Sequence, residues 1–163
     1  MTISRDHRFG PGAGGVLRRP LLAGLALLAV ACQQQPEASH AQGAVEDQVA
    51  FIDALRAREF RVEILGNVEQ PFLGAAGTRV EVSGPGLEEP AELQLFQYES
   101  PGAAADDAGS LGPGGAPAGV HVNWMGPPHF FRAGRLLALY VGADPVALTL
   151  LRELLGEEVA GAG

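Results

Sequence analysis

The chain contains a single cysteine, Cys32, and its position constrains the fold more than any other feature. It closes an apolar run, Leu21 to Ala31, that begins shortly after Arg18 and Arg19. Basic residues, an apolar core and small residues at the end are the order of a secretory signal. We therefore expect residues 1–31 to be removed. Because no second cysteine exists, the remaining chain has no intramolecular disulfide and must be stabilised by packing.

The residues around Cys32 indicate that it is lipidated. Segment 18–32 resembles the signal peptide of bacterial lipoproteins, in which a short lipobox ends in an acylated cysteine. Ala31 fits that lipobox, whereas Ala29 replaces the leucine that is usual three positions before the cysteine, and Leu28 lies one position earlier. The resemblance implies cleavage before Cys32, a palmitate-like chain on the mature protein, and anchorage on the extracytoplasmic face of a bacterial membrane. The membrane is then a partner contacted through the lipid.

Other ways of processing this signal stay open. Residues 29–31 (AVA) and 39–41 (SHA) both fit an ordinary signal peptidase, which would release a secreted or periplasmic soluble protein. Arg18-Arg19 could begin a twin-arginine signal, although Pro20 follows directly. The eleven apolar residues 21–31 fall short of the ~20 that a membrane-spanning helix needs, so we do not expect a retained transmembrane anchor.

The mature chain is short and strongly acidic. Removal of residues 1–31 leaves 132 of the 163 residues, enough for one domain that buries about two thirds of its unfolded surface. It also removes four of the eleven arginines and one of the nineteen acids, so seven arginines face eighteen acids and the net charge is near −11. Such a surface repels phosphate backbones, and we expect no nucleic-acid partner.

Hydrophobic periodicity and turn residues predict the first half of the domain. Spacings of three and four predict a helix from Val45, with Val49, Ile52 and Leu55 on its apolar face. Alternation predicts three strands, and Ser100-Pro101 is typical of the start of a helix. The predicted ranges are strands at 60–64, 79–82 and 91–98, a short helix at 103–108 and a loop at 109–119.

The sequence pattern of the second half of the domain predicts a hairpin and a final helix. Alternation at 120–125 continues into Phe130 and Phe131, and the turn 132–135 leads into 136–141, which is apolar on both faces and predicts a central strand. Asp144 and Pro145 begin a last helix that ends at Gly156. The fold class is therefore α+β, a single two-layer domain with an antiparallel sheet of about five strands and helices on one face. Its expected parts are a lipidated cysteine and polar tether at 32–43, the domain at 44–159 and a flexible tail at 160–163.

The stretch from Trp124 to Gly142 also resembles a set of small extracytoplasmic bacterial lipoproteins that carry a WxxPPHFxRxGRLLxLYVG-like motif before a short helix. The resemblance covers mainly residues 120–156 and implies a fold and a compartment, with no activity attached. The matching residues are Trp124, Pro127, Pro128, His129, Phe130, Arg132, Gly134, Arg135, Leu136, Leu137, Leu139, Tyr140, Val141 and Gly142.

The sequence contains no catalytic motif in the structural context that its chemistry requires. Residues 10–15 satisfy GxGxxG, but no strand precedes them and signal cleavage discards them. The mature chain has no GxSxG and no HExxH, and it has no lysine for a phosphate-binding loop. Ser83 and Ser100 lie at turn or cap positions. We therefore assign no catalytic residue, and an enzyme is not the favoured interpretation.

Two histidines raise the question of a metal. On a strand, His121, Asn123 and Met125 would share one face, and with His129 nearby such a face could hold copper in an oxidising compartment. A polar sheet face with His129 beside aromatic rings explains the same residues. No set of three or four ligands has a recognisable spacing, so we expect no metal and no cofactor.

Aromatic rings and arginines gather in the predicted hairpin and suggest recognition. Such clusters make binding hot spots, although the rings are also typical of a core. The final helix is apolar around much of its circumference, which indicates deep burial or a partner; its residues are Val146, Leu148, Leu150, Leu151, Leu154 and Leu155. The candidate binding surface consists of Trp124, His129, Phe131, Arg132, Arg135 and Tyr140.

These features predict a lipid-anchored extracytoplasmic lipoprotein that acts as a binding or interaction module of the cell envelope. Its partner is an envelope protein or a small ligand. The alternative is an envelope hydrolase that uses His129, Arg132 and an acid brought near by folding.

Overall fold

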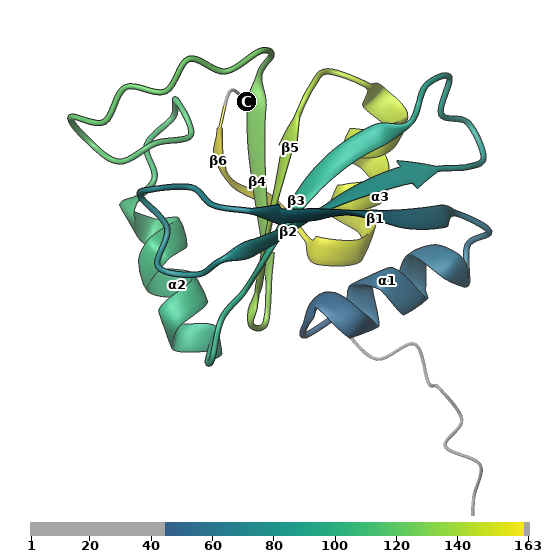
Figure 1. Ribbon diagram of the computed structural model, residues 1–163, viewed down its shortest axis with the longest axis horizontal. Helices are drawn as coiled ribbons and strands as arrows, with labels where there is room; N and C mark the ends of the chain where they lie inside the picture. Colours follow the sequence, from purple (N-terminus) through teal and green to yellow (C-terminus); the bar gives the residue numbers. More distant parts are fainter. Residues whose placement is uncertain (1–44, 162–163) are drawn as a thin grey trace, which may run out of the picture. The chain divides into compact units, whose positions relative to one another are not determined.

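The computed structural model describes residues 45–161, which form one antiparallel sheet and three α-helices (Figure 1). The predicted class, a single α+β domain, is confirmed, and the sheet has six strands where about five were expected. Cys32, the signal and the tether lie outside the described residues. No described helix has the length and apolar character to cross a membrane. The elements in chain order are α1 (Gln48–Arg56), β1 (Arg61–Val68), β2 (Gly77–Ser83), β3 (Ala91–Gln97), α2 (Pro101–Ser110), β4 (Pro128–Ala133), β5 (Leu136–Val141), α3 (Pro145–Leu155) and β6 (Glu158–Gly161).

The strands follow the order β1-β2-β3-β5-β4-β6, so β1 and β6 form the two edges. The predicted central strand is β5, which pairs with β3 on one side and β4 on the other. β6 pairs with β4 and reaches Gly161, two residues beyond the expected end of the domain at 159. This strand was not predicted, because its four residues show no alternation of apolar and polar side chains.

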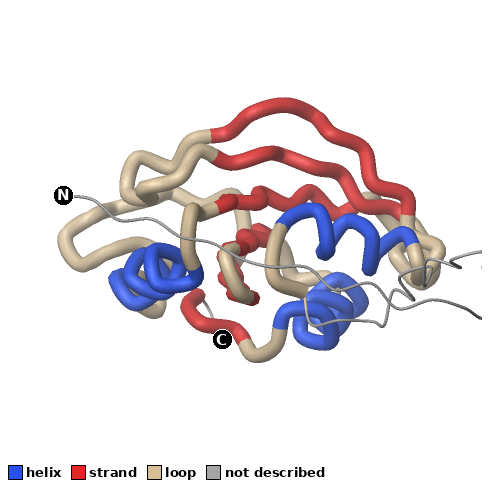
Figure 2. Tube along the Cα trace, turned by 90° about the horizontal axis from the view of Figure 1, so that it is seen from below, coloured by secondary structure: helices blue, strands red, loops and turns tan. Residues whose placement is uncertain are grey.

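The helices lie on both faces of the sheet, because alternate residues of β5 enter two different cores. Leu136, Ala138 and Tyr140 pack with α1 and α3, and we call this side of the sheet the α1–α3 face. Leu137 and Leu139 pack with α2 on the opposite face. Figures 1 and 2 both show α2 on one side of the β4–β5 hairpin and α1 and α3 on the other. The expected placement on one face therefore holds for α1 and α3 and is wrong for α2.

Helix ends follow the predicted capping residues. Ser100 accepts from Ala103 N at the start of α2, and Asp144 accepts from Val146 N and Ala147 N at the start of α3. α1 begins later than expected, at Gln48, with Asp47 as its N-cap. Its buried face contains Phe51, Ile52 and Leu55, whereas Val49 is 68% exposed and does not belong to the core as predicted.

The predicted strand at 120–125 is wrong. These residues form a loop, and β4 begins only at Pro128. Trp124 lies edge-on to Phe72 and Phe130, and its Nε1 donates to the Gly114 carbonyl. Trp124 thus packs in the core of the opposite face, whereas Val120 of the same alternation is 42% exposed.

Candidate functional site

The turn of the β4–β5 hairpin, where Arg135 lies, is joined to the start of α1. The Nη2 atom of Arg135 donates to Oδ2 of Asp47 at 3.0 Å, and its backbone N donates to the Glu46 carbonyl at 2.7 Å. Gly134 has a φ of +53°, and a Cβ there would lie 2.5 Å from the Glu46 carbonyl oxygen, so only glycine allows this approach. Arg135 therefore holds two chain segments together.

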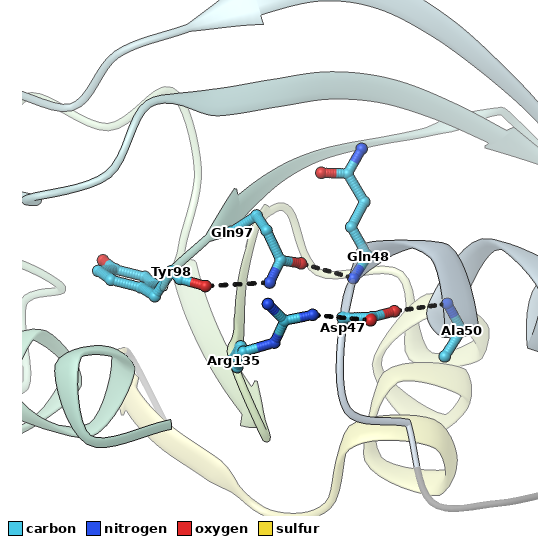
Figure 3. Close-up of polar contacts among 6 residues, drawn as sticks. All are labelled: Asp47, Gln48, Ala50, Gln97, Tyr98 and Arg135. Atoms are coloured by element: carbon cyan, nitrogen blue, oxygen red, sulfur yellow. Dashed lines mark hydrogen bonds and ion pairs between the residues drawn. The ribbon is translucent and has the colours of Figure 1, made fainter. Parts of the chain in front are cut away.

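The same junction contains a second polar bridge, visible in Figure 3. Gln97 accepts from Gln48 N through Oε1 at 2.8 Å and donates to the Tyr98 carbonyl through Nε2 at 3.2 Å. Asp47 Oδ1 accepts from Ala50 N at 2.9 Å as the helix cap. This hydrogen bond and the adjacent Arg135 lower the pKa of Asp47 from its ordinary 3.8, partly opposed by burial. The N-terminus of α1 is thus attached to both β3 and the hairpin turn.

The six residues of the predicted binding surface do not form one surface. Phe131, Tyr140 and His129 are buried at 0%, 6% and 5% exposure. Trp124 is half-buried and packs in the core of the opposite face. Arg132 alternates with Phe131 along β4, which places it on the opposite face as well. The candidate surface is therefore corrected: its rings are mostly core, and Arg135 is a structural residue.

His129 has an acidic partner that the sequence did not identify. Its Nδ1 lies 3.0 Å from Oε1 of Glu158 on β6, and the two side chains are 7% and 14% exposed. The imidazole is also stacked on Tyr140, with ring centroids 6.3 Å apart. Since Arg132 lies on the other face of β4, the hydrolase constellation of His129, Arg132 and an acid does not converge. The contact attaches β6 to the sheet.

His121 lies apart from His129, in the exposed loop before β4. The predicted strand face of His121, Asn123 and Met125 does not exist, and Met125 is 98% exposed. Within residues 45–161 no group of three His, Cys, Asp or Glu side chains is arranged to hold a metal.

A partly buried polar contact joins the loop after β1 to α2. Tyr98 donates to Oδ2 of Asp107 at 2.8 Å, and Gly74 N donates to the same oxygen at 2.6 Å. Burial, reinforced by the Asp107 carboxylate, raises the pKa of Tyr98 well above its ordinary value of 10.0. Asp107 therefore serves as an acceptor that joins two segments.

An open groove lies where the end of α1 meets α3. Its volume is about 410 Å³, and Phe60, Val146 and Leu150 give it an apolar floor. Arg58 and Glu153 place opposite charges at its rim, and Pro145 and Thr149 complete the lining. The unusual apolar circumference of residues 146–155 is the sequence signal for this site: Leu150, Leu151 and Leu155 enter the core, while Val146 stays half-buried in the groove.

The backbone at the end of α1 shapes one wall of this groove. Phe60 N donates to the Leu55 carbonyl and Glu59 N to the Arg56 carbonyl, which is the Schellman arrangement of a helix end. Glu59 adopts the left-handed conformation that this motif requires, with φ +66°. The reversal at Glu59 brings both of its neighbours, Arg58 and Phe60, into the lining. A second depression, of about 440 Å³, is formed by the loop between residues 110 and 122.

Comparison of the chain with protein-family models, curated protein sequences and solved structures found no match. The function is therefore inferred from the sequence and from the geometry of residues 45–161.

Proposed function

We propose that the protein is a lipid-anchored lipoprotein of the bacterial cell envelope whose domain binds a partner protein through the groove between α1 and α3. The location is supported by Cys32, which ends an apolar run in a lipobox-like segment. The binding role is supported by the groove itself. It combines an apolar floor with charged residues at the rim, which is the composition of a protein interface.

The form of the groove favours a protein segment over a small ligand. A small-molecule pocket encloses most of its ligand, whereas this groove is open to solvent and built on a helix. Arg58 and Glu153 do not pair with each other among the described ion pairs, so each charge can meet an opposite charge of the partner. A partner segment that carries an apolar side chain flanked by an acidic and a basic residue would complement the floor and the two charges of the groove.

The anchor is tested by replacing the cysteine. Cys32→Ala should move the protein from the membrane fraction to the soluble exported fraction, and the intact mass of the wild type should include acyl chains. Ser39→Ala, which alters only the later cleavage site, is the matched control and should leave both results unchanged. A wild-type mature protein that starts at residue 42 and carries no lipid would overturn the location.

The groove is tested by crosslinking in living cells. A photoreactive side chain at Thr149, an exposed residue in the groove, should give a discrete crosslinked species. The control places the same side chain at Val49, which is 68% exposed and lies outside the groove. Val146→Glu should abolish the Thr149 product, because it introduces a charge into the apolar floor. Equal products from Thr149 and Val49 would reject the groove as the binding site.

A further inference from the structure

We propose that the free edge of β1 pairs with β1 of a second copy of this chain, in antiparallel register about a two-fold axis at Val62. β1 ends the strand order, and no strand lies beyond it within residues 45–161. Unpaired backbone groups along an edge strand are a template for another strand. Two adjacent apolar residues of β1, Ile64 and Leu65, are 64% and 38% exposed.

The start of β1 before its bulge, together with Phe60, is centred on Val62. Pairing with β2 is continuous from Arg61 to Ile64, and a bulge follows at Leu65. Phe60 extends this line, because a Cβ on Gly84 would lie 3.0 Å from the Phe60 Cα. Segment 60–64 therefore follows β2 without a register shift and has Val62 as its middle residue, and the bulge ends it on one side.

Charge complementarity selects this register. Within one copy, Glu63 lies opposite Glu81 on β2, and Glu81 lies opposite Glu92 on β3, so three like charges stand in a row. With the axis at Val62, Glu63 gains Arg61 of the second copy as its other neighbour, and symmetry forms this pair twice. An axis at Glu63 would instead place Glu63 opposite itself.

The same register gives Ile64 an apolar neighbour. Ile64 pairs with Val80, which is fully buried on the α1–α3 face. The side chain of Ile64 therefore lies on that face too. With the axis at Val62, Ile64 of the second copy lies opposite Phe60, a residue of the groove lining. Each copy thus adds one apolar side chain to the groove of the other. The dimer does not depend on the proposed binding of a partner protein.

Charge reversal tests the pairing. In the exported Cys32→Ala form, sedimentation equilibrium should detect a dimer, and Arg61→Glu or Glu63→Arg alone should each raise its Kd by about tenfold, since two exposed ion pairs become repulsive. The double variant Arg61→Glu with Glu63→Arg should restore the wild-type Kd. An equimolar mixture of the two single variants should form a heterodimer. A monomer at every concentration, or single variants with unchanged Kd, would overturn the proposal.

A cysteine at the symmetry axis tests the register. Val62→Cys in the Cys32→Ala form introduces its only cysteine, and a short bismaleimide should link two copies in high yield. Val49→Cys is the control, because Val49 is exposed and belongs to α1, not to β1. Equal yields from the two variants would reject the register even if a dimer exists. The mass of the Thr149 product keeps the two proposals separate: a product of two copies of this chain reports the dimer, and a product with a different protein reports the partner.

Discussion

Arg135 and Asp47 lie 88 positions apart in the sequence and form an ion pair of 3.0 Å between Nη2 and Oδ2. Asp47 is also the N-cap of α1, so one carboxylate stabilises a helix start and a hairpin turn at the same time. Helix capping and ion pairing can be separated here by substitution, because asparagine retains the cap acceptor and loses the charge.

Removal of the Asp47 side chain should destabilise the domain. Asp47→Ala loses the cap and the ion pair, and we expect the free energy of unfolding to fall by about 1–2 kcal/mol in urea denaturation. Asp47→Asn should lose less than half of that. Asp53→Ala is the control, because Asp53 is exposed and lies 3.6 Å from Arg56, and it should change stability by less than about 0.5 kcal/mol. Equal losses at positions 47 and 53 would contradict the assigned role.

Asp47 should also contribute to acid sensitivity. Its pKa is lowered in the fold, so its stabilisation is present above the ordinary value of 3.8 and is lost as the pH falls through the folded pKa. The difference in unfolding free energy between wild type and Asp47→Asn should therefore shrink as the pH falls below about 4. A constant difference across that range would rule out ionisation of Asp47 as the cause.

Glu59→Gly should stabilise the domain. Glu59 has a φ of +66° at the end of α1, a conformation that glycine adopts without the steric cost of a Cβ. We expect a gain of about 0.5–1 kcal/mol in thermal or urea unfolding, reduced by the greater freedom of glycine in the unfolded chain. The neighbouring Arg58→Gly serves as the control and should destabilise, since Arg58 does not have a positive φ. Destabilisation by both variants would show that the left-handed backbone at Glu59 carries no steric cost.

Loss of the His129 contact should weaken the attachment of β6. His129→Phe leaves the Glu158 carboxylate, 14% exposed, without its 3.0 Å partner, and we expect a loss of about 2 kcal/mol. Hydrogen exchange at Ala160 should accelerate more than exchange in β3. His121→Phe, in an exposed loop, is the matched control and should change neither quantity. Uniform acceleration across the sheet would indicate a general packing defect.

Ionisation of Tyr98 should lower the stability of the domain at alkaline pH. Because its pKa is raised in the fold, its stabilisation is present below 10.0 and is lost as the pH rises above that value. Tyr98→Phe should lower stability by about 1–2 kcal/mol at neutral pH and should flatten this alkaline loss. Tyr140→Phe is the control, since its hydroxyl accepts only a 3.3 Å hydrogen bond from Asp144 N. An unchanged alkaline profile in Tyr98→Phe would refute this role.

Local signals in the sequence were sufficient for most of the elements. The caps at Ser100 and Asp144 and the doubly apolar strand 136–141 each depend on residues close in the chain, and all three were predicted correctly. Helix α1 was found, but its face was shifted, because Phe51 enters the core and Val49 does not. Periodicity alone does not distinguish these two arrangements when both residues are apolar.

The candidate site was harder to predict, because its contacts join distant segments. Nothing near Arg135 in sequence indicates that Asp47 will pair with it, and nothing near His129 indicates Glu158. Clustered rings and arginines in one hairpin resembled a surface, yet alternation along β4 divides them between two faces. The groove requires the segment after α1 to lie beside α3, which depends on the assembled sheet.

The attachment of residues 46–47 to the hairpin turn has a mechanical consequence. If the domain hangs from a lipid at Cys32, any pull between membrane and partner enters through its N-terminus. The load reaches the contacts that Glu46 and Asp47 make with Arg135, and these pass it to β4 and β5 before it can unwind α1. The first turn of α1 then does not carry a pull between anchor and groove alone, because the hairpin shares it.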